Sequence, residues 1–293
     1  METRLEKIIN QIEGIPTLPI VSQKIMEIMS DENASYNDIV KVVENDQSMA
    51  LKILKIANSA FYGSLSKVSS LEHAMIKLGM NEVRSIVLGI SVHNFFSTQS
   101  NGIFDRERFW KHAIVCSQVA KYLAGYYRIG NDDSLFLAGL IHDMGKVVID
   151  QYFHDEFVDI IDYLDSNNTT FSEAEKAVIG TTHYQIAAKL LNQWKFPRKV
   201  IMYILYHHAP WADEGLEQGS VILYLANIIT KLAGYTCHPN EKKIDPEEFS
   251  ESSKVDFVTK MGYDLDYEIL NNIENHVREF ISEEVENVMS LFD

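Results

Sequence analysis

Cysteines and long apolar runs are scarce in this sequence, and both absences limit the class of protein. Only two cysteines occur, Cys116 and Cys237, and they do not form a CxxC pair. This argues against a disulfide-stapled secreted scaffold and favours free thiols in a reducing compartment. The longest apolar stretch, near residues 86–92, is far too short to cross a bilayer, and the first residues lack the apolar core of a signal peptide. We therefore expect a cytoplasmic protein that does not enter the membrane.

Basic residues are outnumbered by acidic ones. The chain has 26 Lys and Arg against 42 Asp and Glu, which gives a formal net charge of -16. Residues 241–293 hold 15 of the acids and only 5 of the bases. This charge repels nucleic-acid phosphates, because non-specific binding to them depends on Lys and Arg. We expect no direct nucleic-acid binding, and we interpret the acidic C-terminal part first as a solvated helix face.

The hydrophobic residues, 46% of the sequence, are enough for one large core. They recur at helical spacing, and no stretch alternates in the way that half-buried strands do. The sequence therefore predicts an all-α protein. The expected helices are Leu5–Ile12 and Val21–Ile28, followed in the second half by 106–125, 132–143, 152–165, 172–194, 198–208 and 218–233.

Polar residues mark where further helices begin and end. Two pairs, Ser35 with Asp38 and Ser69 with Glu72, fit the capping box at a helix start. Gly79 then ends the second of these helices, and Asn81 is expected to cap another that runs to about His93.

The distribution of polar runs suggests three parts. Ser97–Gly102 is interpreted as a linker between two helical lobes, and Tyr235–Ser253 as a longer linker or excursion. The predicted parts are an N-terminal helical lobe (1–100), a second helical lobe (101–235) and an acidic linker with a closing helix (236–293). The closing helix has an apolar face that must pack on the body or on a partner, formed by Leu270, Ile273, Val277, Ile281 and Val285.

Ten histidines are present, and five of them lie in register with the apolar faces of their predicted helices. These are His112, His142, His183, His207 and His208. One inward histidine is ordinarily a core residue with a hydrogen-bond partner, but several unpaired ones would each cost about 1–3 kcal/mol. A shared metal ion would satisfy them together, and Asp143 adds a carboxylate whose two oxygens can bridge two ions. The sequence therefore predicts a metal centre anchored on His142 and Asp143.

Several motifs carry a resemblance to a known family. Residues 139–146, GLIHDMGK, resemble the HD signature of metal-dependent phosphohydrolases, and the doublet at 207–208 is similar to the paired histidines of HD-GYP phosphodiesterases. Pro16–Pro19, Ala57–Gly63 and Ala74–Gly79 resemble the N-terminal lobe of the HDOD family, a branch of the HD phosphohydrolase superfamily. The resemblance covers about residues 10–235. It implies a bacterial signalling domain with an HD-domain-like helical bundle and an additional N-terminal helical lobe.

The resemblance also implies a pocket where two metal ions, often iron or manganese, activate water for attack on a phosphoester. His112, His142 and Asp143 match the ligands of the first ion, and His183, His207 and His208 match those of the second. Lys146 matches the residue that holds the substrate phosphate, so Lys146 and Asp143 are the implied catalytic residues.

One position departs from the superfamily pattern. Its last ligand is an aspartate on a later helix, and the matching residue here is Asn227. Asparagine is neutral and coordinates only through a carbonyl, so we expect weaker binding of the first ion and a larger loss in turnover. Asp213, in the loop after His208, is a candidate replacement carboxylate. The Gly-Tyr-Pro part of HD-GYP enzymes is absent after His208, so recognition of a cyclic dinucleotide is not implied.

Three functions stay open. We expect a regulatory module that binds one or two divalent transition metal ions, catalyses weakly or not at all, and transmits its state to signalling proteins through the N-terminal lobe. The alternative is an active metal-dependent phosphohydrolase or phosphodiesterase acting on a nucleotide or cyclic dinucleotide. In the third, the histidines are satisfied by hydrogen bonds and water, and the function lies in surface contacts around Asn58–Gly63, a segment equally explained as a helix end and tight turn.

Overall fold

The structure is a computed structural model that describes residues 8, 10, 12, 14–30, 35–59, 62, 68–96, 103–130, 132, 134–215 and 218–289. In these ranges every regular element is a helix and no strand occurs, which confirms the predicted all-α fold. No helix in the described part of the chain is both long and apolar enough to cross a membrane. The predicted linker Ser97–Gly102 lies outside the described residues, as does most of the predicted first helix.

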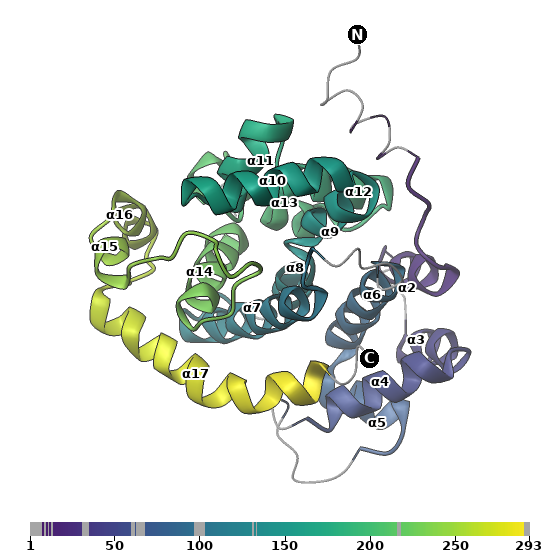
Figure 1. Cartoon of the computed structure of the whole chain (residues 1–293). Coiled ribbons are helices and arrows are strands. Elements are labelled where there is room, and N and C mark those ends of the chain that lie inside the picture. Colours follow the sequence, from purple (N-terminus) through teal and green to yellow (C-terminus); the bar gives the residue numbers. More distant parts are fainter. Residues whose placement is uncertain are drawn as a thin grey trace.

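The N-terminal lobe, purple to blue in Figure 1, contains α2 (Ile20–Ser30), α3 (Tyr36–Glu44), α4 (Gln47–Ala57), α5 (Leu71–Leu78) and α6 (Met80–Phe96). Ser35 and Asp38 form the predicted capping box at α3. The second prediction was wrong by one residue, because Ser70 and not Ser69 caps α5 by accepting a hydrogen bond from the His73 amide. Gly79 ends α5 with a φ of 86°, and α6 follows at once, so Asn81 lies inside the helix and does not cap it.

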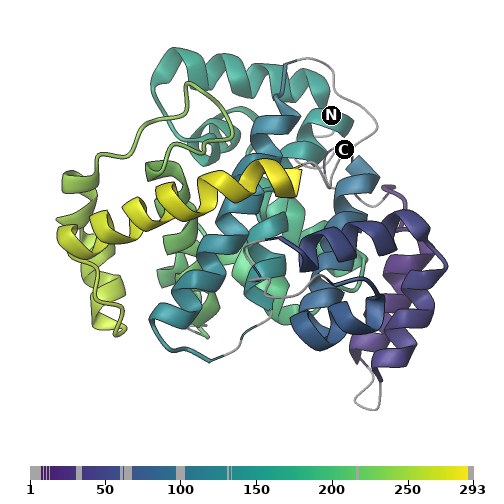
Figure 2. The ribbon, with the colours of Figure 1, turned by 90° about the horizontal axis from the view of Figure 1, so that it is seen from below.

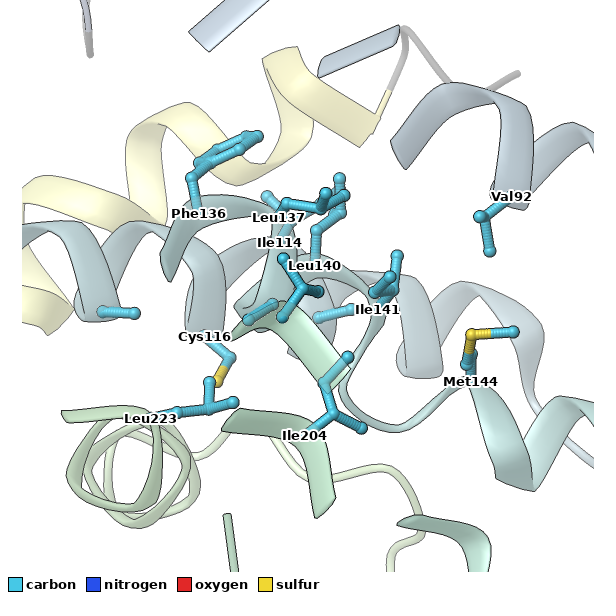
Figure 3. Packing of buried hydrophobic residues seen from close by; sticks show 14 of the residues in the cluster. Val92, Ile114, Cys116, Phe136, Leu137, Leu140, Ile141, Met144, Ile204 and Leu223 are labelled. Atoms are coloured by element: carbon cyan, nitrogen blue, oxygen red, sulfur yellow. The ribbon is translucent and has the colours of Figure 1, made fainter. Parts of the chain in front are cut away.

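The second lobe is built around α8, whose core contacts are shown in Figure 3. Its helices are α7 (Arg106–Tyr126), α8 (Ser134–Ile141), α9 (Met144–Tyr152), α10 (His154–Asn167), α11 (Phe171–Ile179), α12 (His183–Gln193), α13 (Arg198–Tyr206) and α14 (Gln218–Leu232). Leu137, Leu140 and Ile141 of α8 pack in one buried cluster with residues of α7, α13 and α14. Because α8 contacts helices on several sides, the turn that follows it, with residues 142 and 143, is held in the interior.

The single helix predicted over 172–194 is wrong, since the structure has two helices there. Gly180 takes the left-handed conformation with a φ of 76° and ends α11, and Thr182 starts α12 in a capping box with Gln185. The apolar pattern continues across this break because both helices bury one face. The break places His183 in the first turn of α12. Helix α9 was not predicted, because its apolar residues directly follow those of α8.

The C-terminal part folds onto the body through α15 (Pro246–Ser250), α16 (Ser253–Lys260) and α17 (Tyr267–Met289). Figure 2 shows α17 (yellow) crossing the molecule, and it packs against α7 and α14. Leu270, Ile273, Val277 and Val285 are buried, whereas the side chain of Ile281 is outside the described residues. The predicted apolar face is therefore satisfied within the chain. The boundaries of the three predicted parts stay predictions.

Candidate metal centre

Asp143 lies in the turn between α8 and α9 and is 1% exposed. Its two carboxylate oxygens face different histidines. Oδ1 is 3.0 Å from His183 Nε2 and 3.7 Å from His207 Nε2, whereas Oδ2 is 3.4 Å from His142 Nε2 and 3.6 Å from His112 Nε2. One carboxylate thus joins two sets of imidazoles.

The structure brings together the five predicted histidines and Asp143, from α7, the α8–α9 turn, the start of α12 and the end of α13. They form a three-ligand group (His112, His142 and Asp143) and a four-ligand group (Asp143, His183, His207 and His208). In each group the ligand atoms lie within 4.8 Å of one another. Gly145 permits this close packing, because a Cβ there would lie 1.9 Å from the His183 carbonyl oxygen. All are buried except His208, which is half-buried.

Hydrogen bonds fix the orientation of three imidazoles. Nδ1 of His112 lies 2.8 Å from the Tyr235 carbonyl oxygen, Nδ1 of His142 lies 2.7 Å from that of Gly139, and Nδ1 of His207 lies 2.6 Å from that of Ile204. A carbonyl oxygen can only accept, so each Nδ1 carries the hydrogen and donates it. In a neutral ring Nε2 then has a free lone pair directed into the site. Metal-binding histidines are ordinarily held by this arrangement.

His183 is oriented by a carboxylate, Glu175 of α11. Glu175 Oε2 accepts hydrogen bonds from His183 Nδ1, at 2.7 Å, and from the His183 amide, at 2.8 Å. Glu175 is 1% exposed, yet the sequence-based reasoning did not single it out. Its position was hidden because the contact depends on the break at Gly180, which turns α12 back toward α11.

The Nε2 atoms meet at distances that require something positive between them. Nε2 of His112 is 3.2 Å from that of His142, and Nε2 of His183 is 3.1 Å from that of His208. Two lone pairs at this distance repel each other unless a proton or a cation lies between them. His207 Nε2 is moreover buried without a hydrogen-bond partner among the described residues. Imidazole nitrogens with one carboxylate suit divalent transition metals, so the residues present fit such an ion.

In the absence of an ion, protonation at His142 balances the charge in the three-ligand group. Burial lowers the pKa of His112 and of His207 to about 3, so both rings are neutral. Burial also opposes the charged form of His142, but the Asp143 carboxylate raises the pKa of His142 to about 10. A metal ion bound by this group must displace that proton.

Lys146, the residue matched to phosphate binding, is 0% exposed. Its Nζ donates to Asp143 Oδ2 at 2.7 Å and lies 4.5 Å from the centre of the Phe171 ring. Against the effect of burial, the Asp143 carboxylate raises the pKa of Lys146, so the ammonium stays charged. In this structure Lys146 is paired with the central carboxylate and does not face solvent.

Asn227, which the resemblance matches to an aspartate ligand, is buried in the structure. Asn227 on α14 is 2% exposed, and its Oδ1 accepts no hydrogen bond within the described part of the chain. Asp213 does not replace it, because its carboxylate accepts hydrogen bonds from Ser220 Oγ, at 2.9 Å, and from the Gly215 amide, at 3.1 Å. Asp213 belongs to neither ligand group, so Asp143 is their only carboxylate among the described residues.

Comparison with known proteins places these residues in a wider context. The family model for the HDOD domain matches residues 15–210. An HDOD domain protein with unknown function from Geobacter sulfurreducens superposes with a TM-score of 0.80 at 23% identity, over 98% of both chains. A protein from Shewanella amazonensis SB2B superposes with a TM-score of 0.76 at 19% identity, over 98% of both chains. At these identities the likeness shows the shared fold.

Two curated relatives are also similar in sequence. An uncharacterized protein of Treponema pallidum (strain Nichols) is 23% identical over 217 residues, which are 71% of this chain. The uncharacterized protein YuxH of Bacillus subtilis (strain 168) is 23% identical over 177 residues, which are 58% of this chain. The match covers 40% of each relative, so the chain spans about two fifths of the length of the curated relatives it matches.

Proposed function

Because the chain belongs to the HDOD domain family, we propose that it is a regulatory domain that binds a divalent transition metal ion and catalyses weakly or not at all. One observation carries the catalytic part of this proposal. Asp143 and Lys146, the two implied catalytic residues, are buried and paired with each other at 2.7 Å. A substrate phosphate cannot reach Lys146 while this pair is intact.

We propose one tightly held ion, iron or manganese, in the four-ligand group. This group offers four ligand atoms, and Glu175 adds a negative charge behind His183. The three-ligand group has fewer ligands, and Asn227 cannot supply the missing charge. Such an ion would act as a Lewis acid and could activate water, whereas the histidines hold its position and Lys146 neutralises the carboxylate they share.

The N-terminal lobe is the proposed surface for signalling partners. The four most exposed large hydrophobic side chains of the described residues all belong to it: Ile76 (77%), Ile20 (69%), Leu51 (60%) and Tyr36 (51%). Exposed apolar side chains on one lobe are typical of protein contact sites when they form a patch. The earlier candidate surface falls partly on Ala60, Phe61 and Gly63, which lie outside the described residues.

A working phosphohydrolase is the alternative, and one observation favours it. The two oxygens of Asp143 face the two ligand groups separately, as a carboxylate that bridges two ions would do. In this alternative both groups are filled, and Lys146 exchanges Asp143 for the phosphate of a nucleotide-type substrate.

Two matched histidine variants distinguish these functions. We expect elemental analysis of protein purified without chelator to find close to one transition-metal ion per chain. His183→Ala should lose this ion, because it removes a ligand of the four-ligand group, whereas His112→Ala should retain it. Turnover of cyclic dinucleotides, ppGpp and nucleotides by metal-loaded protein should stay below about 1 per second, under the ordinary enzyme range.

Other results would contradict the proposal in identifiable ways. Two ions per chain, one lost in each variant, together with turnover above that limit, would establish the phosphohydrolase. If the wild-type protein contained no metal, the result would favour the third function, in which the protein acts through its surface contacts.

A substitution at Glu175 should lower the affinity for the metal ion, although Glu175 itself is not a ligand. We expect Glu175→Gln to lower metal affinity by about 10–100-fold, the usual cost of losing a carboxylate that orients a histidine ligand. Competition with a chromophoric chelator would measure this. Glu173→Gln on the same helix is the matched control, because glutamine also serves in the capping box with Thr170. Equal affinities of the two variants would refute a role for Glu175 in orienting His183.

A further inference from the structure

The segment 235–242, which we call the strap, lies outside the region matched by the family and contacts the metal centre directly. Figure 1 shows it in the green loop that leaves α14 and passes toward α10 before reaching α15. The Tyr235 carbonyl oxygen accepts from His112 Nδ1 at 2.8 Å. The Cys237 thiol donates to Asp143 Oδ2 at 3.2 Å. The strap therefore contacts two members of the three-ligand group, His112 and Asp143.

The far end of the strap is fastened to other helices. Asn240 Nδ2 donates to Asp165 Oδ1 of α10 at 3.1 Å, and the Lys242 amide donates to the Thr169 carbonyl oxygen at 3.2 Å. The strap thus runs from the end of α14 to the turn between α10 and α11, and it contacts His112 and Asp143 on the way.

A buried ion pair joins this same end of the strap to α14. Glu241 Oε1 lies 2.6 Å from Lys231 Nζ of α14, and the two side chains are 3% and 10% exposed. The second oxygen, Glu241 Oε2, is buried without a hydrogen-bond partner in the described part of the chain. Only one oxygen of the buried Glu241 carboxylate is therefore paired. Breaking the ion pair with Lys231 while both groups stay buried would be strongly destabilising.

We propose that the strap is a cover that opens as a unit and controls access to the metal centre, with Lys231–Glu241 as its latch. While the strap is closed, it contributes to burying Asp143 and Lys146. When it opens, Cys237 and Tyr235 leave Asp143 and His112, and the pocket becomes accessible to an ion or a phosphate-bearing ligand. The proposed control of metal access depends on the metal-binding function proposed above. The opening of the strap does not depend on it.

The thiol of Cys237 reports opening directly. Cys237 and Cys116 are the only cysteines of the chain and both are buried. Cys116 lies inside α7 beside His142 and is 0% exposed, so we expect it to need a wider opening than Cys237, which belongs to the strap itself. Alkylation of the metal-free full chain by iodoacetamide, followed by mass spectrometry of both peptides, therefore compares local with global opening.

We expect Cys237 to react faster than Cys116 in the wild-type chain. Glu241→Gln should raise the Cys237 rate by about tenfold, because a hydrogen bond to a charged partner is roughly twice as strong as a neutral one. The Cys116 rate should rise by no more than the same factor, since both kinds of opening break the pair, and Cys116 should stay the slower of the two thiols. Asn240→Ala, a milder change at an exposed residue, should give a smaller increase in the same direction. Glu248→Gln, an exposed matched control on α15, should change neither rate.

Release of manganese to a chelator provides the separate test of access. It should speed up in Glu241→Gln by the same factor as the alkylation of Cys237. Equal rates for Cys237 and Cys116, unchanged in both strap variants, would overturn the proposal that the strap opens as a unit. Faster alkylation without faster release would overturn its control of the metal centre. A chain that binds no manganese would refute the proposed metal site, and the alkylation rates would still decide whether the strap opens.

Discussion

An Asp143→Ala variant is expected to lose the tightly bound ion of the four-ligand group and to unfold more easily. Asp143 is the one residue shared by the two groups, so its removal leaves two and three histidines without an anionic ligand. It also leaves the Lys146 ammonium buried and unpaired. Breaking a buried ion pair from one side typically costs about 3–5 kcal/mol. Elemental analysis and urea unfolding in the presence of a chelator would measure the two effects separately.

A double variant separates the loss of metal from the loss of stability. Asp143→Ala with Lys146→Met removes both charges, and a side chain of similar length fills the space of Lys146. We expect most of the stability to return, since replacing a buried ion pair by apolar residues is often neutral. Metal binding should stay absent. A single Asp143→Ala variant that retained its ion would show that Asp143 is not a ligand.

Asn227→Asp is expected to create tight binding of a second ion. The side chains have nearly the same shape, and Asn227 Oδ1 is already buried without a partner. An added carboxylate charge near a divalent ion should raise the affinity of the three-ligand group by about 10–100-fold. Without metal, the same carboxylate is a buried unpaired charge, so the metal-free variant should be less stable than wild type. Metal titration followed by elemental analysis would show a change from one ion to two.

The control for Asn227→Asp adds the same charge elsewhere. Asn192→Asp lies on an exposed position of α12, so it should change neither the number of bound ions nor the stability beyond a few tenths of a kcal/mol. If Asn227→Asp bound no additional ion, Asn227 would not lie at the position of a lost ligand, and the assignment carried by the family resemblance would fail there.

Much of the candidate centre could be predicted because helical periodicity places residues on faces. The registers of His112 and His183 with their apolar neighbours predicted inward side chains, and both are fully buried. The HD and HDOD motifs led to the family, which the match over residues 15–210 confirms. Periodicity failed at Gly180, because two helices that each bury one face continue the same pattern across a turn.

The residues around the histidines could not be predicted in this way. Glu175 lies 8 positions before His183, and Cys237 lies 94 positions after Asp143. Nothing in either local pattern indicates these contacts, because an acid or a thiol on an apolar face has many possible neighbours. The pairing of Lys146 with Asp143 was equally hidden, since the motif gives the type of residue and not its partner in the folded chain.

The sequence by itself determined the all-α fold, the family and the inward faces of the histidines, because these depend on spacing along single helices and on short motifs. Only the tertiary structure decided how the histidines divide between the two oxygens of Asp143, which carboxylate orients His183, and that Tyr235 and Cys237 contact the centre. These features depend on how α7, α8, α12, α13 and α14 pack together. Packing brings together residues that are distant along the chain, and the spacing of residues within one helix gives no information about such contacts.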